Sequence, residues 1–269
     1  MNKKIYLGII YSVTAVCMIV GIIINVLSIS SKGYTIFGHS RNTITYDEDL
    51  SSFDTLDIDM SFGNIYIKKG TSFHVSYTGN KNYIPEYSIS GNKLTIEQKN
   101  IRHSLINVGF SNTKSELTIT IPSDITLESL GLDINAGNVS IADIKSSIIN
   151  ADIDMGNLEL SGCEFNTYSS DINMGNLDIS GCEFDTCKGD VNMGNAKISQ
   201  CSFNNISLSV DMGNATIKPV TSDKYGYNLT TDLGNITVFG ADGKHNYSNN
   251  TTSHNMITID VNMGNIDIL

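Results

Sequence analysis

Residues 152–170 read DIDMGNLELSGCEFNTYSS, and residues 171–189 read DINMGNLDISGCEFDTCKG. The two stretches agree at 12 of 19 positions, and residues 190–208 (DVNMGNAKISQCSFNNISL) repeat the pattern a third time. The Gly-Asn pair of this unit begins at residues 137, 156, 175, 194 and 213, with further copies at 63, 234 and 264. A fixed internal period of this length is typical of proteins built from stacked structural repeats.

Within one unit, apolar residues alternate with polar residues. The apolar set is Ile153, Met155, Leu158, Leu160, Cys163 and Phe165. Alternation with a period of two indicates strands with one buried face, so we expect all six side chains to point inward. The Gly-Asn pairs, and the Ser-Gly pairs at 161–162 and 180–181, tolerate a positive φ and therefore mark sharp corners between strands.

A unit of 19 residues is too small to bury its own apolar face, so it must stack on copies of itself. The predicted fold is therefore an all-β, parallel β-solenoid (β-helix) with 19-residue rungs, in which strands stack about 4.8 Å apart. Equivalent residues then form columns: Met155, Met174, Met193 and Met212; Phe165, Phe184 and Phe203; Asn157, Asn176, Asn195 and Asn214. The asparagine amides are expected to hydrogen bond along their column.

An uncharged, apolar stretch at residues 5–29 is long enough to cross a bilayer as a transmembrane helix. Lys3 and Lys4 favour a cytoplasmic location for residues 1–4, which places the rest of the chain outside the cell as a single-pass membrane protein in contact with lipid. The alternative is a cleaved signal peptide, but its apolar region is shorter and ends in a small-x-small site that this sequence lacks.

We divide the rest of the chain into segments according to how strictly each follows the 19-residue period. Residues 30–50 are expected to be a linker, residues 51–130 an irregular first part of the β domain, and residues 131–269 the regular repeats, with a polar loop near 240–255. The 17 Lys and Arg against 28 Asp and Glu give a net charge of −11. This acidity argues against a nucleic-acid partner.

Several segments resemble the bacterial "putative-adhesin" family, a domain of unknown function with Gly-Ser-Gly-Asp-type corners. They are FDTLDIDMSFGNIYIKKG at 53–70, KLTIEQ at 93–98 and LTITIPSDITLESLGLDINAGNVSI at 117–141, followed by the later repeats. This chain departs from the family by having Met-Gly-Asn at its corners. The resemblance implies a solenoid-like ectodomain on a membrane segment, mostly in Gram-positive bacteria and often encoded near envelope-stress systems. It implies no ligand and no catalytic residue.

The motif Asp-x-[Asp/Asn]-x-Gly-Asn, at 152–157, 171–176, 190–195 and 260–265, begins like a calcium-binding EF-hand loop. Twelve positions into the loop, however, Cys163 replaces the glutamate that completes such a site. Polar outer positions of a strand account for the motif without a metal. We expect no cofactor and no metal cage, only a weakly cation-attracting face formed by Asp152, Asp154, Asp171 and Asp190.

Cys163, Cys182 and Cys201 share one repeat position, and Cys187 stands apart. A spacing of CxxC type is absent, which argues against a zinc or redox site. Stacked neighbours are close enough for a disulfide, but these thiols fall on the inward face with the phenylalanines. They are therefore expected to be buried as small apolar side chains.

No catalytic group emerges from the sequence. A β-helix polysaccharide lyase is the enzyme class to consider, but residues 133–217 contain 12 acids, 3 lysines and neither Arg nor His. Such a region repels an anionic uronate and lacks a base. We expect no enzyme but a cell-surface binding or adhesion module for a surface ligand. The alternative is an accessory of an envelope-stress system that acts through a membrane protein.

Overall fold

The computed structural model describes residues 43–98, 115–219 and 224–269, which belong to one compact unit. Within these ranges the chain forms strands and one short 3-10 helix, η1 (Lys81–Tyr83). The strands are β1 (Thr43–Asp49), β2 (Thr55–Met60), β3 (Asn64–Gly70), β4 (His74–Asn80), β5 (Glu86–Ser90), β6 (Lys93–Glu97), β7 (Glu116–Pro122), β8 (Thr126–Ala136), β9 (Val139–Ala142), β10 (Lys145–Met155), β11 (Leu158–Ser161), β12 (Glu164–Met174), β13 (Leu177–Ser180), β14 (Glu183–Met193), β15 (Ala196–Met212), β16 (Ala215–Pro219), β17 (Gly226–Leu233), β18 (Ile236–Val238), β19 (Ala241–Lys244), β20 (Asn246–Asn249), β21 (Met256–Met263) and β22 (Ile266–Ile268).

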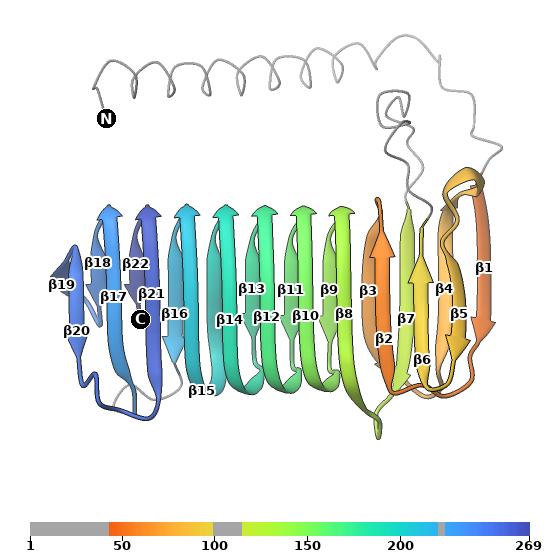
Figure 1. The fold of residues 1–269 in the computed structure, drawn as a ribbon, viewed down its shortest axis with the longest axis horizontal. Coiled ribbons are helices and arrows are strands. Elements are labelled where there is room, and N and C mark those ends of the chain that lie inside the picture. The colour runs from red at the N-terminus through yellow and green to blue at the C-terminus, as the bar shows by residue number, and fades with distance from the viewer. Residues whose placement is uncertain (1–42, 99–114, 220–223) are drawn as a thin grey trace, which may run out of the picture. The chain divides into compact units, whose positions relative to one another are not determined.

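The strands form two rows that lie one behind the other (Figure 1). The long-strand sheet has the order β5-β6-β2-β8-β10-β12-β14-β15-β21-β17-β20. The short-strand sheet has the order β1-β4-β7-β3-β9-β11-β13-β15-β16-β22-β18-β19. We call one long strand and the short strand that follows it a rung. The all-β class with many parallel strands is therefore confirmed.

Successive rungs stack in a regular register in the middle of the domain. β10 pairs in parallel with β12, so that Asp152 lies opposite Asp171, and β12 pairs with β14, so that Phe165 lies opposite Phe184. Each long strand ends at a Gly-Asn corner, and each short strand ends at a second corner such as Gly162. Equivalent side chains consequently form columns that run from rung to rung.

The order of the rungs in space differs from their order in the chain at both ends of the stack. β2 and β3 lie between the β6/β7 pair and the β8/β9 rung. At the other end, β21 and β22 lie between the β15/β16 rung and the β17/β18 rung. The C-terminal strands are thus covered on both sides by earlier segments of the chain.

Antiparallel strands close both ends of the stack. β1, β4 and β5 pair antiparallel at one end, and β19 and β20 do so at the other. β1 lies in the segment expected to be a linker, and β19 and β20 lie in the segment expected to be a polar loop. Pairing uses the free backbone groups at the edge of a parallel sheet, which would otherwise attract another chain.

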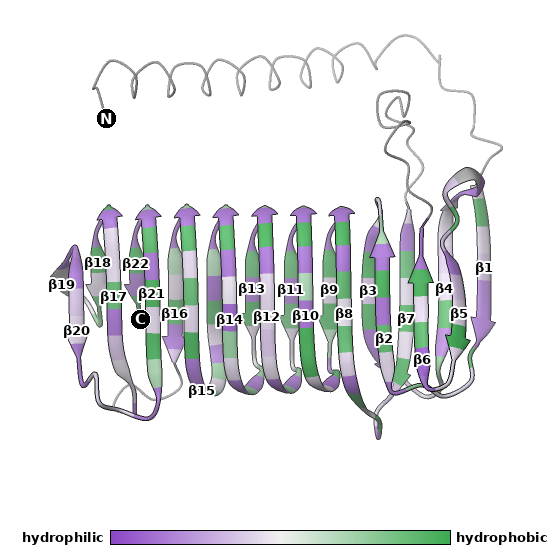
Figure 2. Ribbon diagram, viewed as in Figure 1, coloured by the Kyte–Doolittle hydropathy of each residue, from purple (hydrophilic) through white to green (hydrophobic). Residues whose placement is uncertain are grey.

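The core lies between the two sheets and follows the expected alternation, which appears as apolar and polar bands along the strands (Figure 2). Ile153, Leu158, Leu160, Cys163 and Phe165 are buried, as predicted. The rings of Phe165 and Phe184 stack with centroids 5.0 Å apart, and those of Phe184 and Phe203 with centroids 5.5 Å apart. Tyr225 extends this aromatic column at 4.7 Å from Phe203.

The expectation that the methionine column points inward is wrong. Met155 is 46% exposed, and Met174, Met193 and Met212 are each 43% exposed. The alternation fails because Asp154 and Met155 both face outward just before the chain turns at Gly156. A corner changes the direction of the backbone, so a period of two cannot be continued through it.

The Gly-Asn corner has two separate physical requirements. At Gly156, φ is +152°, and a Cβ atom would lie 1.7 Å from the carbonyl oxygen of Gly137 in the rung before. Only glycine permits this approach of one backbone to the next. The asparagine that follows serves the stack, because Asn157 Nδ2 donates to Asn138 Oδ1 at 3.0 Å.

The same asparagine bonds recur along the stack and define an asparagine ladder. Its members, in spatial order, are Asn64, Asn138, Asn157, Asn176, Asn195, Asn214, Asn265 and Asn235. The predicted hydrogen bonding along the asparagine column is confirmed, and it extends into the irregular rungs at both ends. The predicted transmembrane segment 5–29 lies outside the described residues, and in the part of the chain that the structure describes no helix is long and apolar enough to cross a membrane.

Candidate functional site

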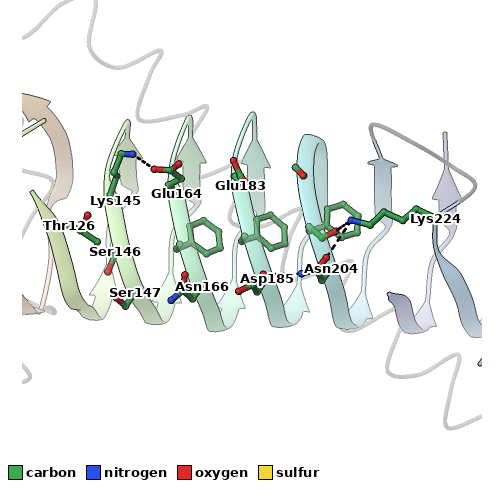
Figure 3. A pocket seen from close by; sticks show the side chains of 14 residues that line it. Thr126, Lys145, Ser146, Ser147, Glu164, Asn166, Glu183, Asp185, Asn204 and Lys224 are labelled. Carbon is green, nitrogen blue, oxygen red and sulfur yellow. Dashed lines mark hydrogen bonds and ion pairs between the residues drawn. The ribbon is translucent and has the colours of Figure 1, made fainter. Parts of the chain in front are cut away.

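A groove crosses the first residues of the long strands β8, β10, β12 and β14 and the equivalent residues 202–204 within β15 (Figure 3). Its volume is about 570 Å³. It is lined by Thr126, Lys145, Ser146, Ser147, Glu164, Phe165, Asn166, Glu183, Phe184, Asp185, Ser202, Phe203, Asn204 and Lys224. Because each strand contributes equivalent positions, the groove runs along the stacking direction and presents polar side chains on every rung that it crosses.

The first row of the groove carries charged and hydroxyl side chains. It consists of Thr126, Lys145, Glu164, Glu183 and Ser202, which are opposite one another in the register. Lys145 and Glu164 form an ion pair across neighbouring strands, drawn as a dashed line in Figure 3. Glu183 is exposed and belongs to no ion pair among the described contacts of the groove.

The second row lies where the long strands bend. Asn166 and Thr167 both face outward, so the alternation of β12 is interrupted at this point. The same position is occupied by Asp185 in β14 and by Asn204 in β15, where Asn204 Nδ2 donates to Asp185 Oδ1 at 2.9 Å. Lys224 closes the end of the groove, with Nζ 3.4 Å from Asn204 Oδ1. The row offers amide and carboxylate groups that can donate and accept hydrogen bonds.

The wall beneath these rows is the aromatic column of the core. Phe165 and Phe184 are 4% exposed and Phe203 is 2% exposed, so only ring edges reach the groove. The Tyr225 hydroxyl donates to the carbonyl oxygen of Phe203 at 3.0 Å. These packed rings hold the polar rows in fixed positions, because a buried aromatic stack leaves little freedom for the strands above it.

A second surface feature contains the aspartates singled out in the sequence. Asp152, Asp171 and Asp190 lie opposite one another on β10, β12 and β14, as predicted. Asp154 lies in the adjacent column, where its Oδ1 accepts a hydrogen bond from Asn173 Nδ2 at 2.9 Å. A shallow depression of about 470 Å³ lies over the first column.

Three further carboxylates continue this column and were missed in the sequence. Asp133 pairs with Asp152, Asp59 pairs with Asp133, and Glu97 pairs with Asp59. We call the six residues the acidic ladder: Glu97, Asp59, Asp133, Asp152, Asp171 and Asp190. Asp133 lies 19 residues before Asp152, so the 19-residue period could have identified it. The period could not identify Asp59 and Glu97, because their strands do not follow the 19-residue spacing.

Crowding of like charges perturbs the acidic ladder. Partial burial raises the pKa of the Asp152 carboxyl above its ordinary value, and the neighbouring carboxylates of Asp133, Asp171 and Asp154 raise it further. Partial burial also raises the pKa of Asp59, and among the neighbouring carboxylates Asp133 raises it most. Within the described residues, no three His, Cys, Asp or Glu side chains converge as metal ligands. The ladder is a line of separate carboxylates.

The sequence model of one family, Toastrack DUF4097, matches residues 53–269. The chain belongs to this family. The matched region begins just before β2 and ends at the last residue, so it includes the groove and the acidic ladder. No curated protein matches the chain significantly.

Solved structures with a similar fold have names that refer to adhesion or lipid binding. A "putative adhesin" from Bacteroides fragilis has 16% identity and a TM-score of 0.47, with 86% of this chain and 98% of that chain covered. A "putative cell adhesion protein" from Clostridium sporogenes has 16% identity and a TM-score of 0.42, with 84% and 98% covered. A "putative lipid binding protein" from Parabacteroides distasonis has 14% identity and a TM-score of 0.44, with 86% and 98% covered. These likenesses concern the fold alone.

The cysteines of the Toastrack domain are buried, as predicted. Cys163, Cys182, Cys187 and Cys201 are free and at most 2% exposed. The backbone N–H of Cys163 donates to Cys182 Sγ at 3.3 Å, and that of Cys182 donates to Cys201 Sγ at 3.4 Å. Burial raises the pKa of the Cys187 thiol well above its ordinary value. A protonated, covered thiol is a packing group and a poor nucleophile.

Proposed function

We propose that this Toastrack chain is a non-catalytic cell-surface module that binds an extended, uncharged polymer such as a neutral glycan along the groove. The observation that carries the proposal is the groove itself, which crosses five long strands and presents polar side chains on each of them at equivalent positions. A ligand with regularly spaced hydroxyl groups can use such repeated donors and acceptors. Residues 5–29 are proposed to hold the module on the membrane.

Charge favours an uncharged ligand over an anionic one. The groove contains two lysines and three acids, and Lys145 is already paired with Glu164. The whole chain carries a net charge of −11. Nucleic acids and polyuronates would be repelled by this field, whereas a neutral polymer would not.

Rigidity supports the same function. Asn204 is held by Asp185, and the floor of the groove is fixed by the aromatic column. Groups that are already ordered lose little conformational entropy when a ligand binds. Several weak contacts along one polymer also add up, because the second contact is intramolecular once the first has formed.

The direct test compares two glutamates of neighbouring repeats. Glu183 lies in the groove, and Glu159 lies on the outer face of the short-strand sheet. The full chain is assayed for binding to neutral and anionic polysaccharides. We expect Glu183→Gln to weaken binding of the neutral polymer by about 10–100-fold, the value of a hydrogen bond to a charged group. Glu159→Gln should leave binding unchanged, and equal effects of the two substitutions would refute the groove as the site.

A strain that lacks the protein separates this function from the envelope-stress alternative. Loss of attachment to glycan-coated surfaces, restored by the wild-type chain but not by Glu183→Gln, would support the binding module. A changed stress-reporter output with normal attachment would support the accessory role and contradict our proposal.

A further inference from the structure

Five methionines form an exposed column that the groove does not use. Met155, Met174, Met193, Met212 and Met263 are between 37% and 46% exposed. Their strands pair in register, so each methionine lies opposite the next. We call these five residues the methionine ladder. Most other large apolar side chains of the repeats are buried, and Ile148, at 42% exposure, stands alone in its column. A continuous exposed column of five methionines therefore calls for an explanation.

The fold does not require methionine at these positions. Ala136 occupies the same column next to Met155, and Leu233 occupies it next to Met263. The contribution of each methionine to the corner is its backbone carbonyl, as when Met174 accepts a hydrogen bond from the N–H of Gly156 at 2.9 Å. Any residue supplies that carbonyl. What the five side chains share, and alanine or leucine lacks, is a thioether sulfur.

We propose that the methionine ladder binds soft, monovalent d10 cations, copper(I) above all and silver(I) as its analogue. Thioethers are soft ligands that select copper(I) over the hard ions that carboxylates bind. A metal–sulfur bond is roughly 2.3 Å long, taking zinc as a guide, so two sulfurs on opposite sides of an ion lie about 4.6 Å apart. Strands in a sheet are about 4.8 Å apart, which allows neighbouring methionines to share one ion.

The columns on both sides of the methionine ladder suit a cation. One side is the asparagine ladder, and the other carries Asp154, Asn173, Asn192, Asp211 and Asn262. Neither column contains a lysine or an arginine. Both are fixed by side-chain hydrogen bonds, such as Asn192 Nδ2 to Asn173 Oδ1 at 2.6 Å. A cation at the ladder therefore meets carboxylate and amide oxygens and no positive charge.

The test follows the methionine methyl groups directly. The full chain, labelled with 13C at the methionine ε-methyl groups and held in detergent, is titrated with silver nitrate in chloride-free buffer. We expect the NMR signals of the five ladder methionines to shift. Met60, which is fully buried in β2, is the internal control and should not shift. Binding should persist at mildly acidic pH, because a thioether has no proton to lose, whereas binding to a thiol should weaken.

A leucine variant distinguishes the sulfur from the apolar surface. M174L/M193L/M212L keeps the apolar character and nearly the volume of the ladder. In competition with a chromogenic copper(I) chelator, we expect this variant to lose at least tenfold in apparent affinity, and the matched control M256L, outside the ladder, to lose none. Thermal melting checks that the variant is folded, and if it is not, M193L alone and the wild-type methyl shifts decide. The proposal is overturned if the ladder signals do not move or if the leucine variant binds as wild type does. The latter result would point to an apolar partner or a second copy.

Discussion

The side-chain oxygen of Asn157 accepts two hydrogen bonds from Asn176, one from the backbone N–H at 2.9 Å and one from Nδ2 at 2.8 Å. Each asparagine therefore fixes both the backbone and the side chain of the next rung. The arrangement continues from Asn176 to Asn195. These hydrogen bonds connect the corners of successive rungs at an exposed edge of the domain, where apolar burial contributes little to stability.

Because of the asparagine ladder, we expect Asn176→Ala to lower the free energy of unfolding by a measurable amount. The substitution removes the bonds that Asn176 makes through its side chain, to Asn157 and from Asn195. At about 0.5–1.5 kcal/mol for each of these three bonds, we expect a loss of about 1.5–4.5 kcal/mol by urea unfolding. Asn166→Ala, outside the ladder, should change stability by no more than about 0.5 kcal/mol. Equal effects would show that the ladder contributes no stability.

The two corner glycines should respond very differently to alanine. At Gly156 a Cβ would overlap the carbonyl of Gly137, whereas at Gly181 the nearest atom is 3.9 Å away and the strain comes from a φ of +62°. We expect Gly181→Ala to cost about 1–2 kcal/mol, the ordinary cost of a left-handed residue. Gly156→Ala should cost clearly more, because the rungs must separate. Thermal melting of both variants tests this, and similar melting points would contradict the steric argument.

Phe184 and Glu183 are neighbours with opposite surroundings. Phe184 stacks between Phe165 and Phe203, and Glu183 faces outward. Phe184→Ala should lower the free energy of unfolding by about 3–5 kcal/mol. Glu183→Ala should change it by no more than about 0.5 kcal/mol, although it lines the groove. Chemical unfolding measures both, and comparable losses would contradict the assigned alternation.

The acidic ladder should make stability depend on pH and salt. The pKa of Asp152 is higher in the folded chain than its ordinary value, so folding favours the protonated form. Its favourable contribution is present at low pH and is lost as pH rises through the folded pKa. At neutral pH and low salt, Asp152→Asn should therefore raise the free energy of unfolding. The gain should be about 1 kcal/mol for each neighbouring carboxylate that the Asp152 charge no longer repels. The gain should shrink near pH 4 and in high salt. A gain independent of both would refute a charge effect.

The same charges predict a response to divalent cations. Calcium or magnesium at millimolar concentration should raise the melting point of the wild-type chain more than sodium chloride of equal ionic strength does. The effect should be weak, because the carboxylates form a line and no cage surrounds an ion. Asp152→Asn/Asp171→Asn should reduce it. If matched sodium has the same effect, the aspartates serve only as a soluble face.

The sequence predicted which aspartates share a column, but it did not predict the groove or the full extent of the acidic ladder. The period put Asp152, Asp171 and Asp190 in one column, and the structure confirms it. The groove was not predicted, because Lys224 belongs to none of the exact 19-residue copies and reaches the groove only through the stacking of the chain. Asp59 likewise enters the acidic ladder only because β2 pairs with β8.

The sequence by itself determined the repeating unit. Alternation placed Phe165 and Leu158 inside, and Gly-Asn placed the corner, because both depend on residues that are close together in the chain. Only the tertiary structure decided which way side chains point next to a corner and which distant strands pair. Met155 faces outward because the backbone turns at Gly156. The strands β21 and β22 lie between earlier rungs, where both of their edges are paired. Such pairings join residues far apart in sequence, so no local pattern specifies them.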